Sequence, residues 1–211
     1  MEARAYQSNI GVPATKVRQI IDLIRNKPVE EALNILRFSP KPVSKVIEKT
    51  LRSAIANALN RGALGVAAQA LGLAQRMIDL SVQYTSERKQ FGVAIGSFQA
   101  VKHHMANIAY KLEYAKTPVY RAAYDIANKL PRATLSVSHA KLAACEVADL
   151  AAKNSIQVHG AMGYTWEVDL HIFMKRAWAF NSSFGTAGFH KQRVAAAILA
   201  DDAPLGAGAT F

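Results

Sequence analysis

The sequence is poor in cysteine and aromatic residues, and it lacks a long apolar run. Its single cysteine, Cys145, excludes an internal disulfide and suits a reducing compartment, so we expect a cytoplasmic location. The charge-free stretch from Gly62 to Gln75 is well short of the roughly 20 apolar residues that a membrane span needs. No basic and then apolar leader opens the chain, so we expect neither a membrane protein nor a secreted one.

What the sequence does contain favours helices. Apolar residues make up 51% of the 211 residues, enough for a real core, while aromatic residues make up only 8%. Alanine is abundant between residues 54 and 75 and between 133 and 152. Alanine loses no side-chain entropy in a helix and fills a sheet face poorly. We therefore expect an all-α protein, and the length allows one or two domains.

The net charge of +11 is spread unevenly along the chain. Residues 1–60 hold 10 Lys and Arg against 5 Asp and Glu, a net charge of +5 in less than a third of the length. A local basic excess indicates a polyanionic partner for this segment, although many proteins are basic without a specific partner.

Three short helical patterns fill residues 14–60. The third repeats apolar residues in steps of three and one from Val43 to Ala58, and turns at Pro28 and Pro40 separate the patterns. The only candidate strand is Ala3 to Ile10. The outer face of the third pattern carries a basic stripe with spacings of four, four and three residues: Lys41, Lys45, Lys49 and Arg52.

From residue 61 onward the patterns predict longer helices in an up-and-down bundle. Gly62 is the only helix breaker near residue 60, so we expect the helices on either side of it to merge. The expected helices and their breaks are Gly62 to Arg88, a loop from Gly92 to Ser97, Phe98 to Leu130 with a kink at Pro118, Pro131 to His159, 165–180 and 186–200. A seam of three- and four-residue steps marks the core face of the second of these: Phe98, Val101, Met105, Ile108, Leu112, Ala115, Val119, Ala122 and Ile126.

The basic stripe has two interpretations. Its spacing suits contacts with successive phosphates of a nucleic acid. The spacing alone favours a solvated surface instead, with Glu48 pairing to Lys45 or Arg52.

Two segments in this part of the chain, MEARAYQSNI and KVRQIIDLIRNKPVEEALNILRFSPKPVSKVIEKTLRSAIANALN (Lys16 to Asn60), resemble the N-terminal part of large-subunit ribosomal protein twenty-two. The resemblance implies binding of rRNA. The family's sheet and long β-hairpin would begin after Asn60, where this sequence supplies neither. The residues expected to face RNA are Lys16, Arg18, Arg25, Lys41, Lys45, Arg52 and Asn57.

Residues 61–211 resemble a different family, the C-terminal helical domain of the acyl-CoA dehydrogenases. The segments that carry the resemblance are ALGLAQRMIDLSVQYTSERKQFGVAIGSFQAVKHHMANI (Ala70 to Ile108), IQVHGAMGYTWEVDL (Ile156 to Leu170) and FGT (Phe184 to Thr186). The resemblance implies FAD-dependent oxidation of acyl-CoA thioesters at the α and β carbons. It also implies a homo-oligomer or a paired subunit.

The same resemblance implies a set of FAD contacts, partly across subunits. Arg88 would meet the pyrophosphate of a neighbouring subunit's cofactor, which suits a bidentate guanidinium. From the residues alone, Arg88 could instead end a helix, and Gln157 to Gly160 could be a helix C-cap. The expected cofactor residues are Arg88, Gln90, Phe91, Gln99, Gln157, Gly160 and Thr186.

The catalytic base is missing from both positions where the resemblance would place it. The chemistry needs a carboxylate to take the α-proton. Most of the family carries a glutamate immediately before the Gly-Thr pair, where this chain has Phe184, and a minority place the base at about Gly62. We therefore expect no catalytic residue and no dehydrogenation by this chain alone, while a role as the non-catalytic member of a subunit pair stays open. No histidine spacing indicates a metal site.

The chain thus reads as two unrelated pieces that join near Asn60 and Arg61. Residues 1–60 form a basic helical segment, and residues 61–211 form the helical bundle. Three functions stay open: a flavin-binding acyl-CoA dehydrogenase-like domain, an rRNA-binding segment with an unrelated extension, or a folded helical protein with neither activity.

Overall fold

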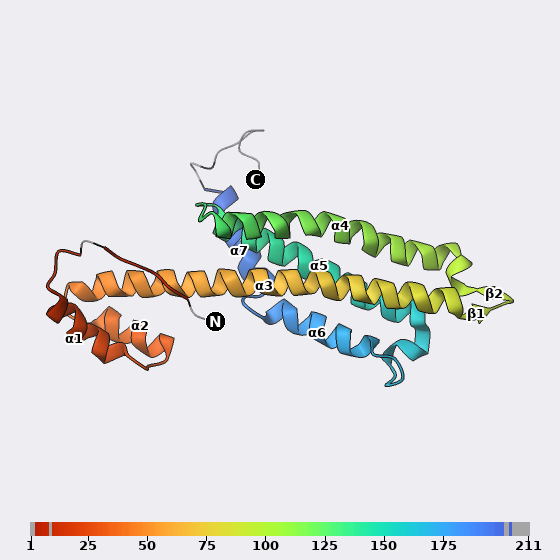
Figure 1. The fold of residues 1–211 in the computed structure, drawn as a ribbon, viewed down its shortest axis with the longest axis horizontal. Coiled ribbons are helices and arrows are strands. Elements are labelled where there is room, and N and C mark those ends of the chain that lie inside the picture. Colours follow the sequence, from red (N-terminus) through yellow and green to blue (C-terminus); the bar gives the residue numbers. More distant parts are fainter. Residues whose placement is uncertain (1–2, 9, 201–202, 204–211) are drawn as a thin grey trace. The chain divides into compact units, whose positions relative to one another are not determined.

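The computed structural model describes residues 3–8, 10–200 and 203, and its regular structure is almost entirely helical (Figure 1). The all-α expectation is confirmed. The described residues form two compact units, Met1–Leu59 and Asn60–Phe211. The elements in chain order are α1 (Ala14–Ile24), α2 (Val29–Phe38), α3 (Val43–Glu87), β1 (Lys89–Gln90), β2 (Val93–Ala94), η1 (Ile95–Ser97), α4 (Gln99–Ala127), α5 (Ala133–His159), η2 (Gly160–Tyr164), α6 (Leu170–Ser182) and α7 (Ala187–Ile198).

A small apolar core holds the first unit together. Pro13 and Pro28 stand at the N-caps of α1 and α2. Proline is tolerated at the start of a helix because the missing N–H has no intrahelical partner there. The apolar faces of the helices bring Ile20, Leu36 and Val43 together, each at most 5% exposed.

The expected strand from Ala3 to Ile10 is wrong. Residues 3–8 and 10 form no strand, and Asn9 lies outside the described residues. A strand needs a neighbouring strand to pair its N–H and C=O groups, and the described part of this unit contains no other strand. The segment is tied down by a side chain instead, since Asn57 Nδ2 donates to the Arg4 carbonyl oxygen over 3.2 Å.

Helix α3 continues without a break through Gly62, so the expectation that two helices merge is confirmed. A glycine in a helix interior costs only about 1 kcal/mol relative to alanine. The alanine and leucine residues that surround Gly62 are strong helix formers, and they carry the helix across it.

The seam expected on α4 forms the core face of the second unit. Its members from Met105 to Ala122 are buried, while Val101 and Ile126 pack at the edge of the core. The seam is wrong at its first residue, because Phe98 lies before α4 and is 38% exposed. Helix α4 remains α-helical through Pro118.

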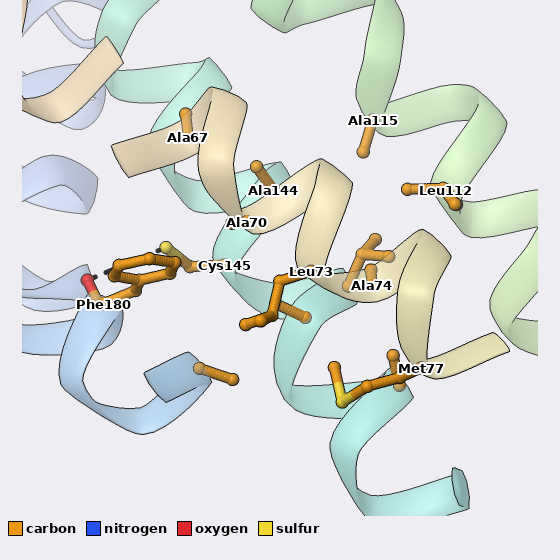
Figure 2. Packing of buried hydrophobic residues seen from close by; sticks show 14 of the residues in the cluster. Ala67, Ala70, Leu73, Ala74, Met77, Leu112, Ala115, Ala144, Cys145 and Phe180 are labelled. Carbon is orange, nitrogen blue, oxygen red and sulfur yellow. Dashed lines mark hydrogen bonds between the residues drawn. The ribbon is translucent and has the colours of Figure 1, made fainter. Parts of the chain in front are cut away.

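Small side chains let three helices approach closely in this core (Figure 2). Ala70 and Ala74 of α3, Ala115 of α4 and Ala144 of α5 are each at most 2% exposed. Methyl groups at a contact allow interaxial distances at the short end of the usual range of about 8–10 Å. Cys145 of α5 is also buried in this core, at 6% exposed.

Between α3 and α4 the chain forms a short hairpin where the sequence predicts a plain loop. Lys89 pairs with Ala94 and Gln90 with Val93. The turn between them holds Phe91 and Gly92 at φ +52° and +82°. Two consecutive positive φ values are what the type I′ turn of a two-residue hairpin requires.

Candidate functional site

Four of the seven residues expected to hold a cofactor lie around the hairpin. Arg88 follows the last residue of α3 and donates its backbone N–H to the Tyr84 carbonyl over 2.9 Å. Gln90 lies on β1, Gln99 begins α4, and Phe91 is 93% exposed in the turn. The guanidinium of Arg88 is exposed and makes no hydrogen bond or ion pair with any other described residue. The Phe91 ring makes an edge-to-face contact with Phe98 at 6.3 Å between centroids and is otherwise exposed. This surface therefore presents an exposed aromatic ring beside an arginine that makes no ion pair with the described residues.

Gln157 and Gly160 lie at the same end of the bundle, at the end of α5. Tyr84, near the end of α3 that leads into the hairpin, contacts the end of α5. Its ring stacks on His159 at 4.2 Å between centroids, and its hydroxyl donates to the His159 carbonyl over 3.4 Å. Gly160 caps α5 at φ +60° and donates its N–H to the Gln157 carbonyl, so the C-cap interpretation describes the local backbone. Burial lowers the pKa of His159, and its hydrogen bond to the Ser155 carbonyl opposes that effect.

Thr186, the seventh expected cofactor residue, lies at the opposite end of the bundle. It is the N-cap of α7, and its hydroxyl oxygen accepts from the Phe189 N–H over 3.3 Å. It follows the loop that contacts Gly62, and the stretch of helix from Gly62 to Arg88 is about 39 Å long. One copy of the chain therefore does not bring all seven residues to one place.

The two positions where a catalytic base is expected contact each other. A Cβ added at Gly62 would lie 2.2 Å from ring carbons Cδ1 and Cε1 of Phe184. The phenyl ring therefore covers the Cα of Gly62, in a loop where Phe184 has φ +53° and Gly185 has φ +105°. A phenyl ring cannot accept a proton, and glycine has no side chain that could accept one. Neither position supplies the general base that removal of an α-proton needs.

His190 holds this loop in place, and sequence reasoning missed it. Its side chain is 0% exposed. Nε2 lies 3.1 Å from the Phe184 carbonyl oxygen, which only accepts, so this nitrogen carries the proton. Nδ1 lies 3.1 Å from Ser138 Oγ of α5. Burial lowers the pKa of His190, and the nearby cations Lys141 and Arg193 lower it further. The hydrogen bond to the Phe184 carbonyl acts in the opposite direction. No motif in the sequence points to this role.

An open cavity of about 680 Å³ lies beside this loop, between α5, the end of α6 and the start of α7. Thr186 and Lys141 both line it. Lys141 is 2% exposed and donates to the Phe180 carbonyl near the end of α6, where a cation is favourable. Its Nζ also lies 3.2 Å from Cys145 Sγ. Burial raises the pKa of the Cys145 thiol, and Lys141 only partly opposes this, so the thiol is a poor nucleophile.

The seven residues expected to face RNA are all exposed in the first unit, and four of them have partners inside the unit. Arg52 forms an ion pair with Glu48 at 2.7 Å, which is one of the two pairings of Glu48, to Lys45 or to Arg52, that a solvated surface predicts. The other three partnered residues are Arg25 with Asp22, Lys41 with Gln19 and Asn57 with the Arg4 carbonyl. The side chains of Lys16, Arg18 and Lys45 make no hydrogen bond or ion pair within the described residues.

Among the described residues, no three His, Cys, Asp or Glu side chains group closely enough to hold a metal ion. None of the described helices is both long enough and apolar enough to cross a membrane.

Comparison with known proteins adds a family to this geometry. The family model for the acyl-CoA dehydrogenase C-terminal domain matches residues 52–199. The chain is 37% identical to the caffeyl-CoA reductase-Etf complex subunit CarC of Acetobacterium woodii, over 67% of this chain and 37% of that protein. It is 42% identical to the acyl-CoA dehydrogenase IpdE2 of Mycobacterium tuberculosis, over 54% of this chain and 34% of that protein.

Solved structures show the same fold. The butyryl-CoA dehydrogenase of Megasphaera elsdenii has a TM-score of 0.65 and 31% identity, over 67% of this chain and 37% of that one. The glutaryl-CoA complex of glutaryl-coenzyme A dehydrogenase has a TM-score of 0.66 and 32% identity, over 72% of this chain and 38% of that one. The chain therefore spans little more than a third of the length of the relatives it matches.

Proposed function

The chain belongs to the acyl-CoA dehydrogenase family, and on that premise we propose that it contributes a flavin-binding helical domain without supplying the catalytic base. The contact between Phe184 and Gly62 carries the second half of this proposal, because it fills both positions where a base is expected. The exposed surface around Arg88 supports the first half.

The residues around the hairpin fit a dinucleotide. The Arg88 guanidinium is exposed and unpaired in the described part of the chain, and it can donate two parallel hydrogen bonds to a diphosphate. Gln90 and Gln99 add amide donors and acceptors, and the exposed Phe91 ring offers an apolar face. FAD, when bound, supplies the acceptor for a hydride. The protein's part here is to hold and orient it.

The distance between the hairpin end and the Thr186 end of the bundle supports FAD binding between copies of the chain or between paired subunits. Arg88 and the loop before Thr186 lie about 39 Å apart along α3, farther than one extended dinucleotide reaches. The hairpin end and the Thr186 end of one copy would therefore serve different cofactor molecules. A base would have to come from another subunit that binds the acyl-CoA. A cytoplasmic location suits the single, buried Cys145.

A flavin absorbance scan of the purified chain, beside its oligomer mass, tests the proposal. We expect bound FAD, and Arg88→Ala should weaken its binding by about 10- to 100-fold, the loss of one charged bidentate contact. Arg76→Ala, which removes an exposed arginine within α3, should leave FAD binding unchanged. Absence of flavin binding would refute the first half. Bleaching of the flavin by an acyl-CoA, with no partner added, would refute the second.

RNA binding by the first unit is a second candidate function, supported by the exposed cations that have no partner in the described residues. Lys45 and Lys49 lie one turn apart on α3 and are both exposed. RNA affinity should then fall steeply with salt, and Lys45→Gln with Lys49→Gln should reduce the salt slope by about 2. The paired lysines Lys111 and Lys116 of the second unit provide the control substitutions. Binding that does not depend on salt would exclude this function.

A further inference from the structure

An open, largely apolar groove of about 610 Å³ lies within the first unit, and we call it the N-terminal groove. It is lined by the N-terminal segment, by one side of α1 and by one side of α3. None of its apolar side chains is fully buried, so water reaches an apolar surface that the described residues leave uncovered. The helical part of this lining consists chiefly of Val17, Ile21, Ile24, Val46, Ile47 and Leu51.

The N-terminal segment (residues 3–8) borders this groove and has unused backbone groups. It returns from the start of α1 along α3 (Figure 1). Ala3 and Ala5 are half-buried while Arg4 and Tyr6 are exposed, which is the period of two expected of an extended chain. From Ala5 onward, the N–H and C=O groups of this segment make no hydrogen bond with another described residue. Unpaired backbone groups along an extended segment are a template for a further strand.

We propose that the N-terminal groove receives an extended strand of a partner protein. This strand pairs with the N-terminal segment and buries apolar side chains against α1 and α3. In this mode of recognition the main-chain hydrogen bonds supply affinity, and alternate side chains supply specificity. The described residues of the first unit contain no strand that could pair with the segment, so the proposal assigns that role to a partner.

The groove has the length of one short strand. Between its lining residues Val46 and Ala54, α3 rises by about 12 Å. A strand of four residues spans about 13 Å. Two of its side chains point to the same face about 7 Å apart, so both can lie on the apolar lining while the other two point to solvent. The partner strand therefore needs apolar residues at every second position.

The charges beside the groove define the residues at the other positions of the partner strand. Arg18 and Arg25 directly follow the lining residues Val17 and Ile24 on α1, and both are exposed. Arg25 pairs with Asp22 in an exposed contact, which is weak, and Arg18 forms no ion pair within the described residues. Acidic residues complement these cations and the net charge of +5 on residues 1–60. The partner strand is thus apolar on one face and acidic on the other.

Fluorescence anisotropy with a labelled peptide that alternates valine and glutamate tests this inference. The full chain is used without flavin and without RNA, so neither function proposed above affects the result. We expect saturable binding. Ile21→Glu places a charge in the apolar lining and should raise the Kd at least about 10-fold. Leu23→Glu makes the same change of charge on α1 outside the lining and should leave the Kd unchanged. Ile21 and Leu23 are 37% and 51% exposed, so both variants should keep the helical circular dichroism of the wild type.

Methylation of the peptide backbone tests the strand pairing itself. Successive N–H groups of an extended chain point to opposite edges, so all valine N–H groups of the peptide face one edge and all glutamate N–H groups face the other. Only one edge can face the N-terminal segment. We therefore expect N-methylation of one residue type to raise the Kd at least about 30-fold, and N-methylation of the other to have little effect. The amides of residues 5–8 should exchange more slowly in the complex.

Three results would overturn the inference. The first is a Kd weaker than about 1 mM for the unmethylated peptide. The second is a Kd that neither methylated peptide changes, because the backbone would then not be paired. The third is a loss of binding with Lys45→Gln and Lys49→Gln but not with Ile21→Glu. Neither lysine lines the groove, so the peptide would then be held by exposed charge, as a nucleic acid would be.

Discussion

Replacing Gly62 with alanine tests the contact between α3 and the loop that precedes α7. The new methyl group would lie 2.2 Å from two ring carbons of Phe184, far inside the contact distance of about 3.5–4.0 Å. Overpacking costs about 1–3 kcal/mol, and an approach more than about 1 Å inside the contact distance belongs to the upper half of that range, about 2–3 kcal/mol. Alanine gains about 1 kcal/mol over glycine in a helix interior. Because the ring must leave its place, we expect the free energy of unfolding to fall by about 1–2 kcal/mol.

The sign of this effect should reverse when the ring is absent. In a Phe184→Ala background, Gly62→Ala meets no ring, so helix propensity should raise the free energy of unfolding by about 1 kcal/mol. The two substitutions should therefore show a coupling energy of about 2–3 kcal/mol. Urea denaturation of the four proteins of the cycle measures each free energy of unfolding, and equal slopes would show that only stability has changed.

Gly65 supplies the matched control on the same helix. A Cβ there would have no atom within 4 Å. Gly65→Ala should raise the free energy of unfolding by about 1 kcal/mol, whether position 184 holds phenylalanine or alanine. If Gly62→Ala stabilises the wild-type protein as much as Gly65→Ala does, the ring does not cover Gly62 and the reasoning is wrong.

Two further predictions concern buried titratable groups. Burial raises the pKa of Asp125, but hydrogen bonds from Arg132 and Ser136 and nearby arginine charges outweigh it and leave the pKa lowered. Its stabilising effect is therefore complete above the unfolded pKa of about 3.9 and is lost as pH falls through the lower folded value. Asp125→Asn should lower the free energy of unfolding by about 2 kcal/mol at pH 7. Unchanged stability at that pH would contradict a stabilising role of the Asp125 carboxylate. The pKa of His190 is lowered mainly by burial, so wild-type stability should fall as pH drops below about 6.5. His190→Gln should weaken this pH dependence of the melting temperature, and an unaltered profile would show that the imidazole is not neutral in the fold.

The helical course of the chain was largely predictable from local patterns. The spacing of Met105, Ile108, Leu112 and Ala115 marks the core face of α4, because these residues share one side of a 3.6-residue helix. The hairpin was not predictable in the same way. Its turn depends on Phe91 accepting a positive φ, which phenylalanine rarely does unless the surrounding structure holds it there.

In the candidate site, too, some residues were predictable from local sequence and others were not. The hairpin residues around Arg88 are neighbours in sequence, so one motif could point to them together. His190 and Lys141 escaped notice because each acts on a loop or helix end that is distant in sequence: His190 bonds the Phe184 carbonyl, and Lys141 bonds the Phe180 carbonyl. No periodicity reports which carbonyl a buried side chain will reach.

The sequence by itself determined the helical class, the joining of α3 through Gly62 and the absence of a carboxylate at either expected base position, since these depend on residue type and short-range spacing. Only the tertiary structure decided that the Phe184 ring covers Gly62 and that Thr186 lies at the opposite end of the bundle from Arg88. Those relations arise from how helices separated along the chain dock against one another, and docking depends on the shapes of all the side chains between them.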